Sequence, residues 1–193
     1  MAAVRPVKLA AALVGLFITT NLLLAAERYR IEKASIVVTC PMTIGGSFET
    51  RTTALAGELA LVPEAAGSVR GTLTVNLKTL KTGISLRDTH LRDHFLEVDR
   101  GPEFAVATLN EIRINNLNGP GHFSGKLMVH GVAREVSGTA TVRRDSRGFR
   151  VDASFPLRVS DFQISRPSYL GVGVTDDIQV HVNLTATATE DIH

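Results

Sequence analysis

Apolar and polar residues alternate with a period of two along most of the chain from about Tyr29 onward. In the clearest run, Phe149, Val151 and Ala153 alternate with polar residues, and the pattern continues to Val159. Strict alternation is typical of β-strands with one buried and one solvated face. The pattern therefore predicts strands at 69–78, 104–106, 111–114, 123–130, 136–143, 149–159 and 178–185.

Short turn sequences separate several of these strands. Asn118-Gly119-Pro120-Gly121 and Asp145-Ser146-Arg147-Gly148 carry the residues that tight turns favour, and the segment 63–67 has a similar composition. Connections this short join antiparallel neighbours, because parallel strands need a longer crossover. The sequence therefore predicts an antiparallel sheet with hairpin connections.

Helical spacing is found in one stretch, residues 85–98. Ser85 followed by Asp88 resembles a capping box with Asp in place of Glu, and Leu91, Phe95 and Val98 fall on one helix face. One short helix cannot cover the apolar faces of seven or eight strands, so the sheet must pack on itself. A sandwich and a closed barrel both satisfy this requirement, but a barrel also removes exposed strand edges.

The N-terminus has the pattern of a secretory signal. Arg5 and Lys8 precede an apolar run from Leu9 to Leu24, and Ala25 and Ala26 follow it. The run is shorter than the about 20 residues that span a bilayer as a helix. We expect residues 1–26 to be a signal peptide, with an uncleaved membrane anchor as the alternative, and residues 27–193 to form one exported, periplasmic domain.

Removal of the signal changes the charge balance. The full chain has 21 basic and 19 acidic residues, and loss of Arg5 and Lys8 leaves 19 of each. A formally neutral domain has no overall basic field to attract nucleic acid, and a chain without Trp offers few rings for base stacking. The single cysteine, Cys40, excludes an internal disulfide, so stability must come from a core. We interpret Cys40 as a small residue in or beside a strand.

Catalytic and metal-binding motifs are weak. His90 and His94 stand four residues apart, but the sequence shows neither a zincin glutamate nor an obvious third ligand near them. Asp176 and Asp177 are interpreted as a loop pair, and the chain has no G-x-S-x-G nucleophile motif. We therefore expect no cofactor, no metal and no enzymatic activity; a metal- or lipid-dependent enzyme is the weakest of the hypotheses.

A series of short motifs resembles the YceI-like family. Its members carry a short R-D-x-H-L-R helix, which matches Arg87 to Arg92, followed by an F-x-V segment and a strand start, which match residues 95–98 and 101–104. Residues 73–83, 125–132 and 160–162 resemble further family segments: a strand ending in Thr-Gly, G-x-L-x-x-H-G-V and S-D-F. The motifs occur in the family's order over about 29–188.

Three positions depart from that pattern. Ala34-Ser35 stands where the family often has His-Ser, Gln163 replaces a glycine after S-D-F, and residues 39–42 lack a basic-hydrophobic character. These departures concern the polar end of the cavity that the family possesses. They affect the identity of the ligand's headgroup more than the fold.

The resemblance implies an all-β, extended, antiparallel, lipocalin-like β-barrel of about eight strands, with one short helix near one end and an elongated apolar cavity. It implies a long-chain polyisoprenoid, lipid or amide as ligand. The residues expected to line the cavity are Phe48, Leu73, Val75, Leu91, Phe95, Phe104, Val106, Phe123, Leu127, Phe155, Leu157 and Phe162. Those expected near the headgroup are Arg87, Asp88, His90 and Arg92, although Asp88 and an arginine could equally serve to cap the helix and close the barrel.

Two hypotheses for function follow. The first is a periplasmic carrier or buffer for a long-chain apolar ligand. The second is a non-enzymatic interaction protein whose barrel interior is simply packed core. Arg143, Arg144, Arg147 and Arg150 flank one hairpin and are interpreted as a solvated turn, with transient membrane contact as the alternative. The sequence leaves homodimerisation open.

Overall fold

The structure is a computed structural model that describes residues 27–62, 68–166, 168–169 and 172–189. The predicted signal segment 1–26 and the predicted turn 63–67 lie outside these residues. Within the described ranges, no helix is both long enough and apolar enough to cross a membrane.

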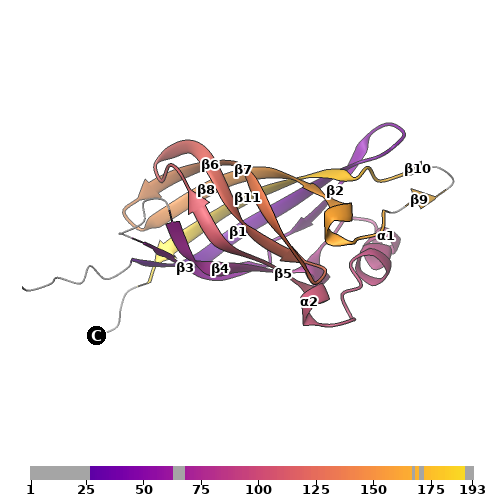
Figure 1. Ribbon diagram of the computed structural model, residues 1–193, viewed down its shortest axis with the longest axis horizontal. Coiled ribbons are helices and arrows are strands. Elements are labelled where there is room, and N and C mark those ends of the chain that lie inside the picture. The colour runs from indigo at the N-terminus through magenta and orange to yellow at the C-terminus, as the bar shows by residue number, and fades with distance from the viewer. Residues whose placement is uncertain (1–26, 63–67, 167, 170–171, 190–193) are drawn as a thin grey trace, which may run out of the picture.

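Antiparallel strands dominate the chain, and the helical elements gather at one end (Figure 1). The strands are β1 (Arg28–Pro41), β2 (Ser47–Thr52), β3 (Leu55–Leu61), β4 (Ser68–Asn76), β5 (Val106–Ile114), β6 (Gly119–Val129), β7 (Val132–Asp145), β8 (Gly148–Arg158), β9 (Ser168–Tyr169), β10 (Val172–Gly173) and β11 (Asp177–Ala188). The helical elements are η1 (Leu77–Thr79), α1 (Ser85–His90), η2 (Leu91–Phe95), α2 (Pro102–Ala105) and η3 (Val159–Phe162).

The sheet closes into a barrel because the first and last long strands pair with each other. The strand order is β11-β8-β7-β6-β5-β4-β3-β1, and β1 pairs with β11 from Tyr29↔Ala188 to Thr39↔Gln179. The predicted eight-stranded antiparallel barrel is therefore confirmed. On its other edge β1 pairs with β3 near Arg28 and with β2 from Ile36 onward, so β2 and β3 together fill one position in the wall.

The helical end differs from the prediction in detail. The helix predicted over 85–98 is α1 followed by the π-helical turn η2, and it ends at Phe95. Residues 102–105, of which 104–105 were predicted to begin a strand, form the short helix α2 instead. Pro102 at its first position explains the difference, because proline has no N–H to donate and a φ angle already suited to a helix start.

Two of the hairpin predictions can be compared with the described strands. The turn between β7 and β8 is held by the Asp145 carboxylate, which accepts hydrogen bonds from the backbone N–H groups of Arg147 and Gly148. The turn predicted at Asn118–Gly121 is displaced, since β6 already begins at Gly119. Pro120 is tolerated in this strand because it pairs with Thr141 near the strand's start.

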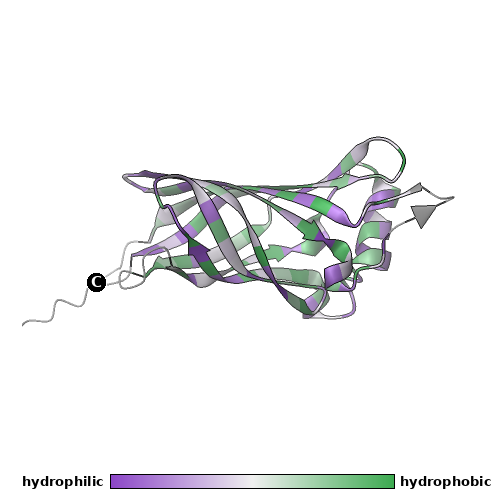
Figure 2. Ribbon diagram, turned by 45° about the horizontal axis from the view of Figure 1, so that its top comes forward, coloured by the Kyte–Doolittle hydropathy of each residue, from purple (hydrophilic) through white to green (hydrophobic). Residues whose placement is uncertain are grey.

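Hydrophobic residues alternate with polar residues along the barrel wall (Figure 2). Two clusters of buried side chains occupy the inside, one around Val142 and Phe149 and the other around Phe123 and Phe155, while a third lies beneath the helices around Leu80 and Leu96. Burial of such side chains contributes about 25 cal/mol per Å² of apolar surface and is the main source of stability in a chain without disulfides.

Gly138 allows two phenyl rings to meet on the inner face of β7. It lies opposite Phe123 of β6, and the rings of Phe123 and Phe155 are edge-to-face with centroids 5.5 Å apart. A methyl group on Gly138 would overlap the Ser154 carbonyl oxygen and would lie 2.6 Å from Phe155 Cβ. Only a residue without a side chain fits between these strands.

We predict that Gly138→Ala lowers the free energy of unfolding by roughly 2–3 kcal/mol, because the added methyl overlaps backbone that cannot move away. Gly125→Ala is the control. Its methyl would meet the flexible Leu109 side chain at 3.0 Å and the Asn110 carbonyl oxygen at 3.2 Å, contacts that a small shift relieves, and we expect a cost of about 1 kcal/mol or less. Urea unfolding of both variants measures the difference. Equal effects of the two substitutions would contradict this account of the packing.

Candidate ligand-binding cavity

A cavity of about 320 Å³ runs along the inside of the barrel. Every strand of the closed barrel contributes to its wall, and α1's continuation η2 contributes Leu91 and Phe95. Among the described residues that line it, none carries a charged side chain. The volume lies at the lower end of the about 300–1,000 Å³ usual for ligand pockets. The cavity therefore suits a slender apolar molecule.

Ten of the twelve side chains that we expected in an apolar lining belong to the cavity wall. They are Phe48, Leu73, Val75, Leu91, Phe95, Phe123, Leu127, Phe155, Leu157 and Phe162. Phe104 and Val106 do not belong to it, so their predicted placement is wrong. The Phe104 ring packs instead against the His130 imidazole, with centroids 4.7 Å apart, and beneath the Arg100 guanidinium.

A β-bulge explains why the alternation misplaced Val106. Residues 106, 112 and 114 have the same parity, so strict alternation would put all three on one face. At Glu111, however, φ is 51° and the pairing with β6 shifts by one residue between Asn110 and Arg113. The extra residue reverses the two faces of the strand. Ala107 and Leu109 therefore line the cavity before the bulge, and Ile112 and Ile114 line it afterwards.

Aromatic packing closes the barrel end that carries the β7–β8 turn. Tyr29 and Phe149 meet edge-to-face with centroids 4.7 Å apart, and both are buried. The Tyr29 hydroxyl donates to the Glu27 carboxylate, which also accepts from Arg144 at 2.8 Å. Burial and the Glu27 carboxylate raise the pKa of Tyr29 to about 12. Arg144, one of the four arginines that flank this turn, therefore has a structural partner in Glu27.

The opposite end is covered by the helical segment, which a buried carboxylate holds in place. Asp88 of α1 accepts hydrogen bonds from the backbone N–H of Thr82 at 2.6 Å and from its hydroxyl at 2.7 Å. The predicted capping box is therefore wrong, because the residue that caps α1 is Ile84 and it has no side-chain bond. Asp88 fixes the loop before the helix, which is a structural role.

The other three residues of the predicted headgroup group are separated from one another. The Arg87 guanidinium lies 4.4 Å from the centroid of the Phe48 ring. His90 is exposed and packs edge-to-face on His94, while Arg92 is half-buried with its Nη1 atom lacking a hydrogen-bond partner among the described residues. None of the four lines the cavity. The structure does not gather them into one pocket.

His130 joins three segments at the same end. Its Nδ1 atom lies 3.2 Å from the Phe162 carbonyl oxygen, and its Nε2 atom lies 3.0 Å from the Glu97 carboxylate. The hydrogen bond from Arg100 lowers the pKa of Glu97. His130 and Gly131 form a tight turn, with φ angles of 54° and 74°. This histidine has a structural role between β6, η3 and the loop after η2.

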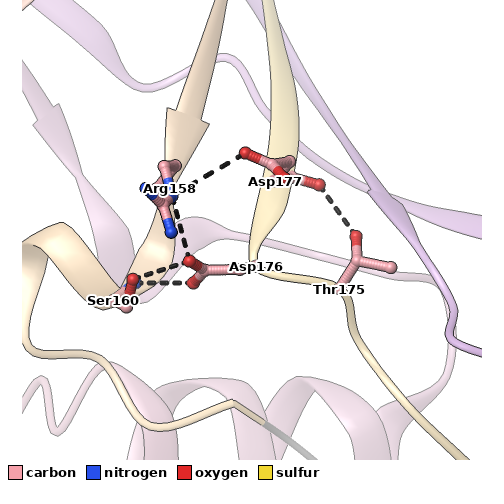
Figure 3. Close-up of polar contacts among 5 residues, drawn as sticks. All are labelled: Arg158, Ser160, Thr175, Asp176 and Asp177. Atoms are coloured by element: carbon pink, nitrogen blue, oxygen red, sulfur yellow. Dashed lines mark hydrogen bonds and ion pairs between the residues drawn. The ribbon is translucent and has the colours of Figure 1, made fainter.

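Asp176 and Asp177 belong to a polar cluster that connects η3 to β11 (Figure 3). The Asp176 carboxylate accepts from the Ser160 backbone N–H at 2.9 Å, from the Ser160 hydroxyl at 2.6 Å and from Arg158 at 3.2 Å. The hydrogen bonds from Ser160 lower the pKa of Asp176. The carboxylate's contacts are those of a structural clasp, consistent with the loop-pair interpretation.

Comparison with protein-family models identifies one match. The model described as "YceI-like domain" matches residues 29–186. The chain belongs to the YceI-like family. No curated protein matches the chain.

Solved structures with the same fold include three proteins at low sequence identity. BcnA from Burkholderia cenocepacia is 16% identical with a TM-score of 0.65, over 78% of this chain and 94% of that chain. A polyisoprenoid binding domain from Saccharophagus degradans is 17% identical with a TM-score of 0.63, over 83% and 98%. The YceI protein of Campylobacter jejuni is 16% identical with a TM-score of 0.55, over 76% and 88%.

Sequence reasoning did not identify the polar residues of the cavity wall. Thr50 and Thr52 of β2 and Cys40 of β1 all line it beside Phe48. Within 47–52 the alternation does place Phe48, Thr50 and Thr52 on one face, which was the available signal. Threonine at alternate positions is usually assigned to the solvated face, so only the fold shows that these side chains point inward.

We predict that Asp88→Asn destabilises the helical end of the barrel and makes the protein's stability less dependent on pH in the acidic range. The hydrogen bonds from Thr82 lower the pKa of Asp88 from its ordinary 3.8. The ionised carboxylate therefore stabilises the fold at neutral pH, and this contribution disappears as the pH falls below 3.8 and through the folded-state pKa. We expect the variant's Tm to be several degrees lower at pH 7 and to change less between pH 7 and pH 3.

Thermal unfolding at a series of pH values measures both effects. Asp93→Asn is the matched control, because Asp93 is an exposed carboxylate on the adjoining turn η2. A profile for Asp88→Asn that coincides with that of Asp93→Asn would contradict the role assigned to Asp88.

Proposed function

We propose that this protein binds a long-chain apolar molecule, such as a polyisoprenoid or a related lipid or amide, inside its barrel and acts as a periplasmic carrier or buffer. The observation that carries the proposal is the cavity, which extends along the barrel and has no charged side chain among its described lining residues. The likeness to the Saccharophagus degradans polyisoprenoid binding domain supports the choice of ligand class. The predicted signal segment 1–26 supports the location.

In this proposal, burial of the ligand's hydrocarbon chain supplies the binding free energy. Each methylene group that leaves water contributes about 0.8 kcal/mol, so a chain of ten groups offers about 8 kcal/mol before the costs of ordering it are subtracted. The wall needs no reactive group for this purpose. Phe123 and Phe155, whose rings are in edge-to-face contact, line the part of the cavity that the ligand's hydrocarbon chain would occupy.

The alternative of an interaction protein with a packed interior is less well supported. A packed interior would place interdigitating side chains across the barrel axis, as protein cores do. Small residues such as Ala107, Ala140 and Ala153 instead face inward from β5, β7 and β8 and leave the cavity between the walls. No observation on the described surface favours a particular protein partner over a lipid ligand.

We infer that the ligand enters and leaves at the end covered by α1, in contact with an anionic lipid bilayer. Among the described residues, the exposed large hydrophobic side chains are Ile44, Ile84 and Leu86, at 64%, 51% and 66%. They lie on the β1–β2 connection and at the start of α1, which occupy the same end of the barrel (Figure 1). Lys81 and Arg87 in the same segment complement anionic headgroups. The other end is closed by Tyr29 and Phe149.

We predict that Ala153→Trp weakens binding of a long-chain ligand by at least about tenfold, because an indole that buries 150–250 Å² would occupy the cavity. Ala133→Trp, on the exposed side of β7, is the control and should leave affinity unchanged. The wild-type chain has no Trp, so each variant's fluorescence also reports folding and occupancy. Equal affinity of the two folded variants would contradict binding in the barrel.

We also predict that the double variant Ile84→Ser/Leu86→Ser slows uptake of a fluorescent dodecyl alcohol from phosphatidylglycerol vesicles by at least about fivefold, because less apolar surface enters the bilayer. Its affinity for the same probe in detergent should not change. Arg143→Ser/Arg150→Ser at the opposite end is the control. A slower rate in that control, with normal rates in the first variant, would assign exchange to the other end.

A further inference from the structure

One hydroxyl group in the cavity wall has no hydrogen-bond partner among the described residues. Thr50 lies on β2, its residue is 4% exposed, and its buried Oγ1 atom makes no hydrogen bond. Its side chain lines the cavity. Buried polar atoms are nearly always hydrogen-bonded, because an unpaired one has lost water without replacement. The Thr50 hydroxyl is therefore suited to receive a partner that the protein itself does not provide.

The other hydroxyl groups of the wall have partners or reach solvent. Thr52, two residues further along the same face, lies 2.6 Å from the Thr79 hydroxyl and accepts from the Ala54 N–H at 3.0 Å. The Tyr29 hydroxyl donates to Glu27. Ser165 is exposed and Thr108 is only half-buried. Thr50 thus differs from each of them in being both buried and unpaired.

The surroundings of Thr50 favour a neutral partner. Thr50 is paired in register with Val38, and Phe48 with Cys40, so three of its neighbours on β1 and β2 are apolar groups or a thiol. Burial raises the pKa of Cys40 to about 11, which keeps that thiol uncharged. None of the lining residues provides a counter-charge. An ionised carboxylate or phosphate at this depth would lose its hydration without compensation.

Arg87 is a cation that contacts this part of the wall. Its guanidinium stacks on the Phe48 ring at 4.4 Å but does not line the cavity. Stacking of this kind orients the guanidinium without using its N–H donors. Arg87 therefore provides the competing chemistry, an oxyanion at the rim, which an experiment can separate from a neutral group at Thr50.

We propose that Thr50 is the hydrogen-bonding partner of the ligand's polar end, and that this end is a neutral oxygen group, an alcohol or a carbonyl, rather than a carboxylate or phosphate. The inference rests on the proposed function and adds the orientation of the ligand. The polar end lies at the β1–β2 side near α1, and the apolar chain extends toward Tyr29 and Phe149.

Three probes of equal chain length test the chemistry: 1-dodecanol, dodecanoate and dodecane, each measured by displacement of a fluorescent probe from the mature protein. We expect dodecanol to bind about tenfold more tightly than dodecane, as one hydrogen bond to a buried hydroxyl allows, and dodecanoate to bind more weakly than dodecanol. In Thr50→Val, which keeps the side chain's shape, the preference for dodecanol over dodecane should disappear while dodecane binding is retained.

Thr74→Val on β4 is the control outside the cavity, because the Thr74 hydroxyl donates to the Ala56 carbonyl oxygen and does not line the wall. It should retain the preference for dodecanol. The ligand-free proteins give an independent measurement: Thr50→Val should be at least as stable as wild type in thermal unfolding, because it removes an unpaired polar atom, whereas Thr52→Val, which loses the bond to Thr79, should be less stable. A lower Tm for ligand-free Thr50→Val would overturn the proposal.

Two binding results would also overturn it. A preference for dodecanol that survives in Thr50→Val would place the polar end elsewhere. Tighter binding of dodecanoate than dodecanol, lost in Arg87→Gln, would assign an oxyanion to the rim. Failure of all three probes, dodecane included, would instead reject the binding cavity itself, so the two proposals fail in different ways.

Discussion

Pairing of β1 with β11 is the constraint on which the rest of the molecule depends. The two strands come from opposite ends of the described chain, and their pairing from Tyr29 to Thr39 turns an open sheet into a closed wall. Closure joins the first and last long strands and forces the strands to place one face inward. The apolar residues of the alternating pattern then meet around a common axis, and the cavity is the space that their side chains leave.

The two ends of the barrel are closed by different kinds of interaction. At one end, Tyr29 and Phe149 pack tightly with Val142, the most completely buried side chain among the described residues. At the other, the cover consists of short helical elements that pack on the small cluster around Leu80 and Leu96. Polar contacts also hold them: Asp88 with Thr82, His130 with Glu97, and Asp176 with Ser160. Polar clasps on short elements separate at lower cost than a packed aromatic cluster, so the helical end is the one suited to open.

The polar atoms inside the barrel also differ between its two ends. The unpaired Thr50 hydroxyl and the neutral Cys40 thiol lie on the β1–β2 side of the wall, next to the helical end. At the tightly packed end, the described lining residues offer the Tyr29 hydroxyl, which already donates to Glu27. An amphiphilic ligand therefore has one favoured direction in the cavity. That direction would place its polar group near the end at which we propose that it is exchanged.

The period-two pattern by itself determined the all-β class and the two faces of most strands, because alternation depends only on backbone geometry. The turn sequences added the short antiparallel connections. The motif series added the barrel and the expectation of an apolar ligand. The tertiary structure decided the local departures from regular alternation. The bulge at Glu111 reverses the faces of β5 and excludes Val106, Pro102 starts a helix that removes Phe104 from the wall, and Asp88 bonds Thr82 instead of capping α1. The inward position of Thr50 also required the fold, since a threonine's place depends on which face of its strand the closed barrel encloses.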